Sequence, residues 1–563
     1  MYTHAWLFIV DVACIAVIFT ASCASAAATR WWPAFPLPNR LYVLEDQGSY
    51  ARQVAAETLA GLLARRDRLR GPGPMIWLDQ GNPDYTRWLR MFLARHKVPE
   101  TRHPGGLWTL VRKFHRAGIV RGYILYNPGT KDDPHDLSVN WATSLCGPMG
   151  GIAVDASQQA EAKRVGLPML ADARGKDFAW MLAKLHHRYT RRQLCLLQPG
   201  QPNLRDEAVA AGALTTLDVP GGGYRHALSL MQPGGIVFGW GVSEYNSVMM
   251  ASRYALRVVC SDWASNIPVL SSGHTGLAYM YAPAAPHPAP AYEPGHRYLS
   301  FIISDGDNLQ WAIGGFGSDP DLWASPQRGR IPFGWSLPLI DLMQTNPYEI
   351  TWLQAHAHPD DELLQFGLGY FFLDDYGQTR GGPAALTSLL RTERPYLARL
   401  HLHVLLVFTH KWDSPAALRG YEAIADELPD VRAVLAIQYD PYAAGRGAIR
   451  WFYHLSGRPM AVITPRTFLW NQGQGQNNDY FQWPDFAAKA LNTWASGRPG
   501  GYASQFAWVG IHAWSKFPLG KSGRPISQYN AAVYTAKHLG RTITVVTPGQ
   551  LADLLIAART SQE

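Results

Sequence analysis

Cysteine is scarce in this chain and shows no spacing typical of a metal site. Five cysteines occur in 563 residues, and two of them, Cys14 and Cys23, lie close to the N-terminus. The remaining Cys146, Cys195 and Cys260 allow at most one disulfide bond, which excludes a disulfide-stabilised scaffold. We expect buried free thiols at these three positions.

Charged residues are also few, at 17% of the chain, and the basic ones form no long block. The formal net charge is +8, but the arginines are scattered, for example at Arg65, Arg66, Arg191 and Arg192. A nucleic-acid-binding protein concentrates such residues on one face, so we predict no nucleic-acid partner. Acidic polysaccharide stays open as a partner.

After the N-terminus the sequence lacks any apolar run long enough to span a bilayer. The N-terminal apolar stretch ends in Ala-Ser-Ala at 24–26, a pattern typical of signal-peptide cleavage. We therefore predict a leader over residues 1–26 and a secreted or periplasmic protein. A lipoprotein anchored through Cys23 and a retained membrane anchor stay open, because no Lys or Arg precedes the stretch and Asp11 interrupts it.

What the sequence does contain is 47% apolar residues, arranged as strand-like runs that alternate with helix-like runs. This alternation predicts parallel sheets covered by helices, and the length predicts more than one domain. We expect a domain at 30–145, a second at 146–282, a Pro-rich linker at 283–295 and a third domain at 296–563.

The third domain contains eight or nine candidate strands, among them 297–304, 349–356 and 366–372. This number predicts a (β/α)-barrel-like domain, with an open doubly wound sheet as the alternative. The predicted fold is therefore α/β, with N-terminal α/β domains followed by a C-terminal (β/α)-barrel-like domain.

Two aspartates stand at the end of an apolar run in the sequence YLSFIISDGDNLQW, residues 298–311. On an extended strand Asp305 and Asp307 would point to the same side, and Gly306 would let the backbone approach a ligand closely. Carboxylates so near each other repel unless one is protonated or both meet a ligand. We therefore predict a site here rather than a simple Asp-Gly turn.

Polar and aromatic side chains follow several other candidate strands, at the edge where barrels and open α/β sheets place their sites. We consider four carboxylates as catalytic candidates, namely Asp305, Asp307, Asp374 and Glu244. The candidate substrate-binding residues are Asn308, Trp311, Trp335, His356, His358, Tyr370, Asp375, Trp412, Asp440, His512, Trp514, Trp240 and Asp262. The two histidines of the segment HAH have no recognised metal-binding spacing, so we predict no metal ligand.

Several blocks resemble the GxGYxYP putative glycoside hydrolases. SDGDNLQW, GLGYFFL, FAWVGIHAWS and TVVTPGQLADLL resemble the C-terminal part of that family, and FGWGVSEYNSV and VVCSDWASNIPVLSS resemble its N-terminal region. Gly367, Gly369 and Tyr370 match the signature, whereas Phe372 and Leu373 replace its second Tyr and its Pro. The chain thus looks like a divergent member, and the resemblance implies a glycoside hydrolase without assigning catalytic residues.

The sequence therefore predicts an exported carbohydrate-active enzyme that hydrolyses an oligo- or polysaccharide with a pair of carboxyl groups. In the most specific version Asp307 is the base or nucleophile, and Glu244 or Asp374 is the acid. Two alternatives stay open, a metal-dependent carbohydrate esterase or deacetylase and a non-catalytic glycan-binding protein. We predict no cofactor for the hydrolase, and a divalent cation for the esterase.

Overall fold

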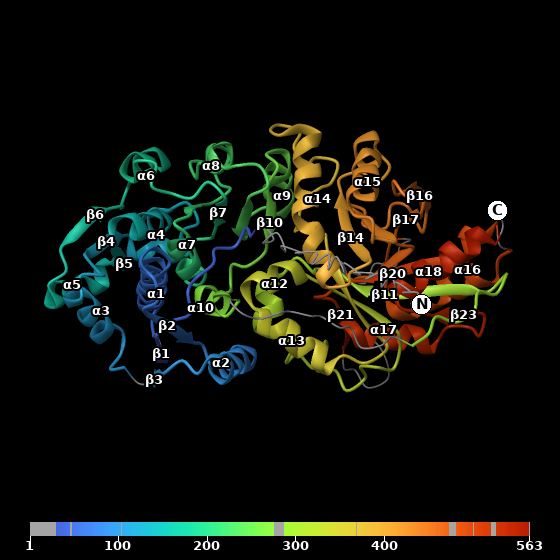
Figure 1. The fold of residues 1–563 in the computed structure, drawn as a ribbon, viewed down its shortest axis with the longest axis horizontal. Coiled ribbons are helices and arrows are strands. Elements are labelled where there is room, and N and C mark those ends of the chain that lie inside the picture. The colour runs from blue at the N-terminus through green and yellow to red at the C-terminus, as the bar shows by residue number, and fades with distance from the viewer. Residues whose placement is uncertain are drawn as a thin grey trace, which may run out of the picture.

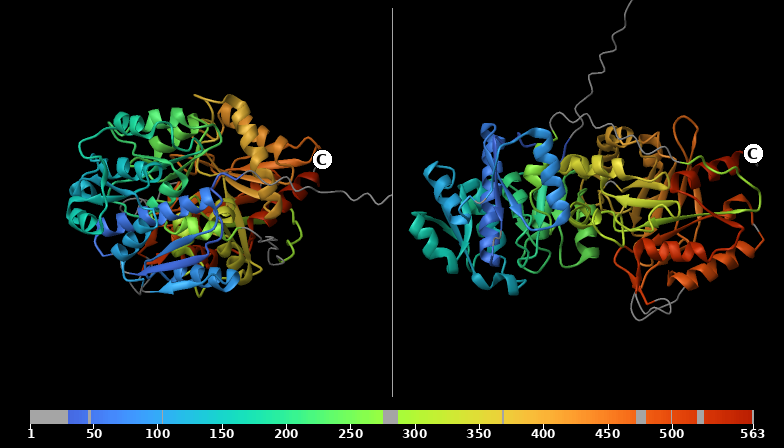
Figure 2. Two further views of the ribbon diagram at one scale, coloured as in Figure 1. Left: turned by 60° about the vertical axis from the view of Figure 1, so that its left-hand side comes forward. Right: turned by 90° about the horizontal axis from the view of Figure 1, so that it is seen from below.

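The computed structural model describes residues 30–45, 48–102, 104–274, 287–367, 369–471, 480–498, 500–518 and 525–561. The predicted leader at 1–26 and the first four residues of the predicted linker lie outside this part. The molecule is elongated, with the N-terminal sheets at one end and the largest sheet at the other (Figure 1). The right-hand view in Figure 2 shows the same separation. In the described part of the chain no helix combines the length and apolar character of a membrane crossing.

Three small parallel sheets precede residue 274. The first has the strand order β2-β1-β3 (Pro74–Asp79, Arg40–Glu45, Glu100–Arg102), and the second has the order β5-β4-β6 (Gly151–Asp155, Gly122–Tyr126, Met169–Asp172). The third has the order β10-β9-β7-β8 (Arg257–Val259, Ile236–Gly239, Gln193–Leu196, Leu214–Thr216). Strands β4, β5 and β7 are buried along their whole length, as expected for parallel sheets between helices.

Helices cover these sheets, and the chain starts several of them with polar caps. They are α1 (Tyr50–Arg70), α2 (Pro83–His96), α3 (Leu107–Arg116), α4 (Ser138–Met149), α5 (Gln159–Val165), α6 (Phe178–Leu185), α7 (Arg205–Ala211), α8 (Tyr224–Leu230), α9 (Glu244–Arg253) and α10 (Ile267–Ser272). Helix α4 packs against strands of both the second and the third sheet. The predicted domain boundary at 145/146 falls inside α4, and the division into domains stays a prediction.

The C-terminal region is built on one large sheet that curls part of the way round. Its strand order is β16-β17-β15-β14-β13-β12-β11-β20-β18-β19, and β23 pairs with β11. These strands are β11 (Arg297–Ile303), β12 (Phe333–Leu337), β13 (Asp361–Phe366), β14 (Val404–Thr409), β15 (Ala433–Gln438), β16 (Ile449–Tyr453), β17 (Pro459–Ile463), β18 (Thr467–Leu469), β19 (Phe481–Gln482), β20 (Phe506–Ile511) and β23 (Ile543–Val545). All pairings are parallel except that of β16.

Helices follow most of these strands, as in βα repeats. They are α11 (Leu309–Trp311), α12 (Leu339–Thr345), α13 (Pro347–His356), α14 (Gly382–Arg399), α15 (Pro415–Glu427), α16 (Pro484–Ser496), α17 (Gln528–Lys537) and α18 (Pro548–Thr560). A short antiparallel pair, β21 (Lys516–Phe517) with β22 (Ile526–Ser527), precedes α17. The last helix begins with a capping box formed by Thr547 and Gln550.

The sheet follows the strand order of a (β/α)-barrel but is not closed among the described residues. A closed barrel would pair β17 with β18, and no ladder joins these two strands in the described part of the chain. The region is therefore a curled, half-barrel sheet, and full closure is not confirmed. Two predicted strands are also wrong, because residues 349–356 belong to helix α13 and the strand expected at 366–372 ends at Phe366 as β13.

Buried polar contacts join the third sheet to the C-terminal region. Arg257 on β10 forms an ion pair with Glu393 on α14, and both side chains are 1% exposed. Arg257 also lies over the ring of Trp31, 3.9 Å from its centroid. Trp31 and its neighbour Trp32 both donate their indole N–H groups to Asp341 on α12. Trp31 and Trp32 of the N-terminal segment thus link the third sheet to the C-terminal region.

The predicted free thiols and the high tryptophan content are both accounted for by burial. Cys146, Cys195 and Cys260 are buried and free, which confirms the sequence-based expectation. Seven tryptophans of the described chain are also fully buried, namely Trp32, Trp77, Trp88, Trp141, Trp323, Trp335 and Trp508. Most of the aromatic content therefore serves the core.

Candidate active site

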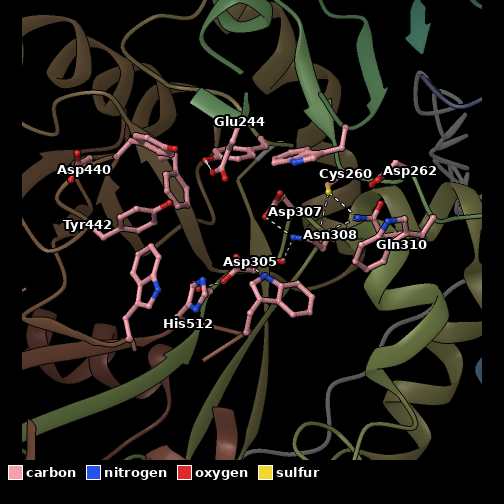
Figure 3. A pocket seen from close by; sticks show the side chains of 18 of the residues that line it. Glu244, Cys260, Asp262, Asp305, Asp307, Asn308, Gln310, Asp440, Tyr442 and His512 are labelled. Carbon is pink, nitrogen blue, oxygen red and sulfur yellow. Dashed lines mark hydrogen bonds between the residues drawn. The ribbon is translucent and has the colours of Figure 1, made fainter. Parts of the chain in front are cut away.

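A pocket of about 610 Å³ lies where the third sheet meets the C-terminal sheet (Figure 3). Segments that follow the carboxyl ends of β9 and β10 form one side, and segments that follow β11, β15, β18 and β20 form the other. The lining residues are Trp240, Glu244, Cys260, Asp262, Trp263, Ser304, Asp305, Asp307, Asn308, Gln310, Tyr370, Phe408, Tyr439, Asp440, Tyr442, Trp470, Phe481, His512 and Trp514.

Asp305 and Asp307 both line this pocket, in a tight turn directly after β11. Asp305 adopts a left-handed backbone conformation with φ +62°, so the segment turns instead of continuing as a strand. Gly306 lies against Ser336, where an added Cβ would come within 2.4 Å of the hydroxyl oxygen. The predicted close approach at Gly306 is thus an approach to the neighbouring strand β12, and it holds the turn beside the open pocket.

Asp305 is surrounded by hydrogen-bond donors. Its Oδ2 accepts from the hydroxyl of Ser304 and, at 3.2 Å, from the backbone N–H of Ala513. Its Oδ1 accepts from the indole N–H of Trp514 at 3.2 Å. An ionised carboxylate only accepts hydrogen bonds, so this set of donors suits the charged form.

Asp307 lies deeper, with 7% of its surface exposed. Burial, followed by the nearby charges of Asp305 and Glu244, raises the pKa of Asp307 well above its ordinary value. The amide of Asn308 contacts its Oδ1 at 3.4 Å. Asp307 therefore favours the protonated form.

Glu244 reaches the pocket from the side of the third sheet, at the first turn of α9. Ser243 caps this helix by accepting from the backbone N–H of Asn246. Glu244 Oε1 accepts a hydrogen bond of 2.7 Å from the hydroxyl of Tyr370. Burial and the charge of Asp305 raise the pKa of Glu244, although the Tyr370 hydrogen bond acts in the opposite direction.

The signature loop, which carries Gly367, Gly369 and Tyr370, pairs with the edge strand β10 of the third sheet. Tyr370 and Val258 on β10 exchange two backbone hydrogen bonds, of 2.8 and 2.9 Å. Gly369, with φ +94°, lies so close to Arg257 that a Cβ would come within 2.7 Å of its Cδ. Trp240 stacks on the Tyr370 ring at 6.2 Å between centroids. The glycine of the signature thus permits the contact that brings Tyr370 to Glu244.

Several polar side chains lie together at the end of the pocket nearest the N-terminal sheets. The thiol of Cys260 lies 3.1 Å from Asn308 Oδ1, and the amide of Gln310 donates to its sulfur at 3.1 Å. Asp262 follows β10 and is 5% exposed. Burial raises the pKa of Asp262 to about 6.

At the opposite end, His512 lies flat against Trp470, with 4.2 Å between ring centroids and 10° between planes. His512 Nδ1 lies 2.9 Å from the hydroxyl of Ser515, and burial lowers the pKa of His512. Asp440 is exposed at the rim, and 45% of Trp514 is exposed. Ten of the predicted residues thus meet in one pocket, namely Asp305, Asp307, Glu244, Asn308, Tyr370, Asp440, His512, Trp514, Trp240 and Asp262.

Asp374, Asp375 and Trp412 do not line the pocket. Asp374 accepts hydrogen bonds from the backbone N–H groups of His410 and Lys411, at 2.7 and 2.9 Å, and so holds the turn after β14. Asp375 is paired with Arg253 at 3.3 Å. Trp412 lies under a guanidinium group, that of Arg450, at 5.2 Å.

Four further candidates also lie outside the pocket. Trp335 is completely buried and donates to Asp361, and Trp311 is buried behind Trp514. His356 ends helix α13, and His358 precedes β13, so both lie at the amino end of that strand, away from the carboxyl edge. In the described part of the chain, no three His, Cys, Asp or Glu side chains are grouped as the ligands of a metal ion would be.

Nine lining residues were not among the candidate site residues, namely Cys260, Trp263, Ser304, Gln310, Phe408, Tyr439, Tyr442, Trp470 and Phe481. All nine are aromatic or uncharged. Phe408 and Phe481 lie within strands, and for the other seven only a position after a strand could have indicated a site. Tyr442 follows the cis Asp440–Pro441 peptide bond, and Trp470 comes directly after the three-residue strand β18.

Three family descriptions match the chain. The "GxGYxYP putative glycoside hydrolase C-terminal domain" matches residues 295–555, the second domain of the N-terminal region matches 120–189, and the third domain matches 194–272. A search of curated proteins finds no match. The crystal structure of a "putative hydrolase" from Bacteroides thetaiotaomicron VPI-5482 is similar over 93% of this chain and 96% of that chain, with a TM-score of 0.75 and 22% sequence identity.

The structural likeness, at this identity, concerns the fold. The three family matches together extend over most of the chain and include both sides of the pocket, with Glu244 in one match and Asp305 in another. The protein therefore belongs to the GxGYxYP putative glycoside hydrolase family.

Proposed function

We propose that the protein is an exported glycoside hydrolase that acts on an oligo- or polysaccharide. The observation that carries the proposal is the convergence of three carboxyl groups, those of Glu244, Asp305 and Asp307, on one aromatic-lined pocket. Cleavage of a glycosidic bond typically requires one protonated carboxylic acid and one carboxylate. The family membership supports a hydrolase of this class.

The surroundings of the three groups suggest their roles. Asp305 is the proposed nucleophile or base, because its donors stabilise a carboxylate. Glu244 is the proposed acid, since its pKa is raised and it approaches the pocket from the side opposite Asp305 (Figure 3). Asp307, which sequence reasoning favoured as base or nucleophile, is better suited to remain protonated and to bind a sugar hydroxyl. Asp374 is unsuited to the acid role, because backbone N–H groups occupy its oxygens.

In the proposed reaction Glu244 donates its proton to the glycosidic oxygen while the bond from that oxygen to the anomeric carbon breaks. The leaving sugar departs as an alcohol. Asp305 then either attacks the anomeric carbon, forming an ester that water hydrolyses, or removes a proton from a water molecule that attacks directly. Proton NMR of the first product distinguishes retention from inversion of configuration.

Two tryptophans at the rim support an extended carbohydrate as the substrate. Trp263 is 55% exposed and Trp514 is 45% exposed, whereas seven other tryptophans are fully buried. The two come from different sheets and line the same pocket. Exposed aromatic faces with polar edges are suited to stack on the C–H faces of sugar rings.

The decisive experiment compares wild type with Asp305→Asn on a panel of aryl glycosides and oligosaccharides. We expect turnover to fall at least 1,000-fold in the variant, with an unchanged Tm. Asp426→Asn, which changes an exposed carboxylate on α15 outside the pocket, serves as the control and should retain full activity. Azide should partly restore activity to Asp305→Asn if this residue is a nucleophile.

Three outcomes would contradict this assignment. Full activity of Asp305→Asn would exclude its catalytic role. Binding of glycans by the wild type without turnover on any member of the panel would favour the non-catalytic alternative. Release of acetate from acetylated glycans, inhibited by a chelator, would favour the metal-dependent esterase.

Export is the part of this proposal that depends only on the leader sequence. The Ala-Ser-Ala pattern at 24–26 supports cleavage shortly before the segment that contains Trp31 and Trp32. Mass spectrometry of the protein recovered from its native cell fraction would give the mature N-terminus. Recovery of an uncleaved chain from the membrane would instead indicate an anchor.

A further inference from the structure

A second cavity, of about 320 Å³, lies far from the chemistry just described. It is at the amino ends of β4 and β5, beside the C-terminal end of α1, whereas the candidate active site is at carboxyl ends of strands. Five of its lining residues are arginines, namely Arg65, Arg66, Arg70, Arg121 and Arg188, and none is acidic. We refer to it below as the arginine cavity.

The positive charge of the arginine cavity is only partly compensated. Arg66 is paired with Asp67 at 2.6 Å, and Arg188 donates to two backbone carbonyl groups. No hydrogen bond or ion pair joins the guanidinium groups of Arg65, Arg70 or Arg121 to any residue that the structure describes. Three cations thus face one small space without a protein anion.

Arg65 is the most constrained of the three. Its side chain is half-buried, and a Cβ at Gly147 or Gly212 would come within 3.0 Å of its Cδ and 2.4 Å of its Nη1, respectively. Burial and the charges of Arg68 and Arg188 lower the pKa of Arg65, which shows that its charged form is disfavoured here. Favourable interaction with the end of the α1 helix dipole explains arginines on α1 but not Arg121 and Arg188, which come from other segments.

One side of the arginine cavity is apolar. Leu62 and Ile119 contribute to its wall, and Leu69 at its edge is 66% exposed. A ligand with a charged group and an apolar face would therefore find partners for both parts. Guanidinium groups bind carboxylate, sulfate and phosphate through two parallel hydrogen bonds, and a buried cation gains most from such pairing.

We propose that the arginine cavity is a binding site for the oxyanion of an acidic ligand, a carboxylate or sulfate carried by a ring that packs on Leu62 and Ile119. An acidic sugar has this chemistry. The proposal does not depend on the proposed hydrolase activity, because the cavity lies outside the candidate active site and contains none of its residues.

The test is calorimetric titration of the full-length protein with glucuronate, with sodium sulfate and with glucose. We expect glucuronate to bind, glucose to leave no signal from this site, and added NaCl to weaken binding through screening. Arg65→Gln/Arg121→Gln should weaken glucuronate binding at least tenfold. Arg90→Gln/Arg112→Gln removes the same charge from exposed positions on α2 and α3 and should bind like wild type.

The outcomes separate the sources of the anion. Sulfate that binds as tightly as glucuronate would show a general oxyanion site, and binding of glucuronate alone would show an acidic-sugar site. Absence of anion binding, or equal loss in the control variant, would overturn the proposal. If Arg65→Gln/Arg121→Gln does not fold, the single Arg121→Gln change at an exposed position provides the same comparison, with an expected loss of at least threefold.

Discussion

Among individual residues, the three carboxyl groups of the pocket differ in their surroundings more than in their chemistry. Asp305 is supplied with donors, whereas Asp307 and Glu244 are buried beside it and have raised pKa values. Like charges in one small space repel each other, so Asp307 and Glu244 keep their protons to higher pH than ordinary carboxyl groups do.

The raised pKa predicts a pH-dependent cost to stability at Asp307. In the unfolded chain an Asp ionises near pH 3.9, whereas the folded state holds the proton to higher pH. The protonated carboxyl group therefore makes its full contribution to the free energy of unfolding below pH 3.9. This contribution is lost as the pH rises through the raised pKa of the folded state. Asp307→Asn cannot ionise, so we expect its Tm to equal that of wild type near pH 4 and to exceed it at pH 7 to 8.

Calorimetry from pH 4 to 8 would measure this difference. The control is Phe408→Leu, a change at the same pocket that removes no ionisable group and whose Tm difference from wild type should not depend on pH. A Tm for Asp307→Asn that falls further below wild type as pH rises would mean that the charged form of Asp307 stabilises the fold.

Tyr370 is predicted to act on Glu244 by position rather than by touching the reacting atoms. Its hydroxyl hydrogen bond lowers the pKa of Glu244, so Tyr370→Phe should raise that pKa and shift the basic limb of the pH–rate profile to higher pH. Loss of one hydrogen bond is worth about 1 kcal/mol, or about fivefold in kcat. Tyr245→Phe, whose hydroxyl contacts His410 instead, should leave the limb unchanged.

At the scale of elements, the signature loop shows why a motif can be defined by glycines. Gly369→Ala adds a Cβ that meets Arg257 and also strains a backbone at φ +94°. We expect a loss of about 2 kcal/mol or more in unfolding free energy, together with reduced activity, because Tyr370 is displaced. Gly221→Ala, at φ +79° in open space, carries the strain alone and should cost less. Equal losses in urea unfolding would show that the contact with Arg257 is unimportant.

Elements with a clear pattern were predictable, and those with two plausible patterns were not. Strand β11 followed by Asp305 and Asp307 was recognised, because an apolar run stops abruptly in polar residues. The sequence predicts a strand over residues 349–356, which is wrong, because a short apolar segment of a core helix lacks distinguishing periodicity. That error placed His356 at the wrong edge of the sheet, and His358 with it.

The candidate site was predictable where charge or glycine identified it. Glu244 and Asp262 were found as polar residues after strands, although their meeting with Asp305 depends on how two sheets pack. Tyr442 and Trp470 were missed because an aromatic residue in a loop resembles one in a core. Only the folded arrangement separates the rim tryptophans from those that fill the interior.

At the scale of the whole molecule, the joint between the third sheet and the C-terminal region should be sensitive to charge. Glu393→Gln would remove the carboxylate that forms an ion pair with the buried Arg257, and we expect a loss of about 3 kcal/mol or more in unfolding free energy. Urea unfolding would measure it. Glu427→Gln, which breaks the pair of Arg391 and Glu427 at the surface of α14 and α15, should leave stability nearly unchanged.

The two rim tryptophans predict how far the substrate extends. Trp263→Ala and Trp514→Ala should each raise KM for long oligosaccharides by about tenfold, because each removes a stacking surface. Short aryl glycosides do not reach both sides of the pocket, so at least Trp263→Ala should leave their KM close to wild type. A uniform loss with all substrates would instead point to a distorted pocket.

The Glu244 carboxyl group comes from one half of the chain and the Asp305 carboxyl group from the other. A fragment that contained either half alone would carry only one of the two carboxyl groups of the proposed catalytic pair. We therefore expect a chimera that joins one half to an unrelated partner domain to lose the proposed activity.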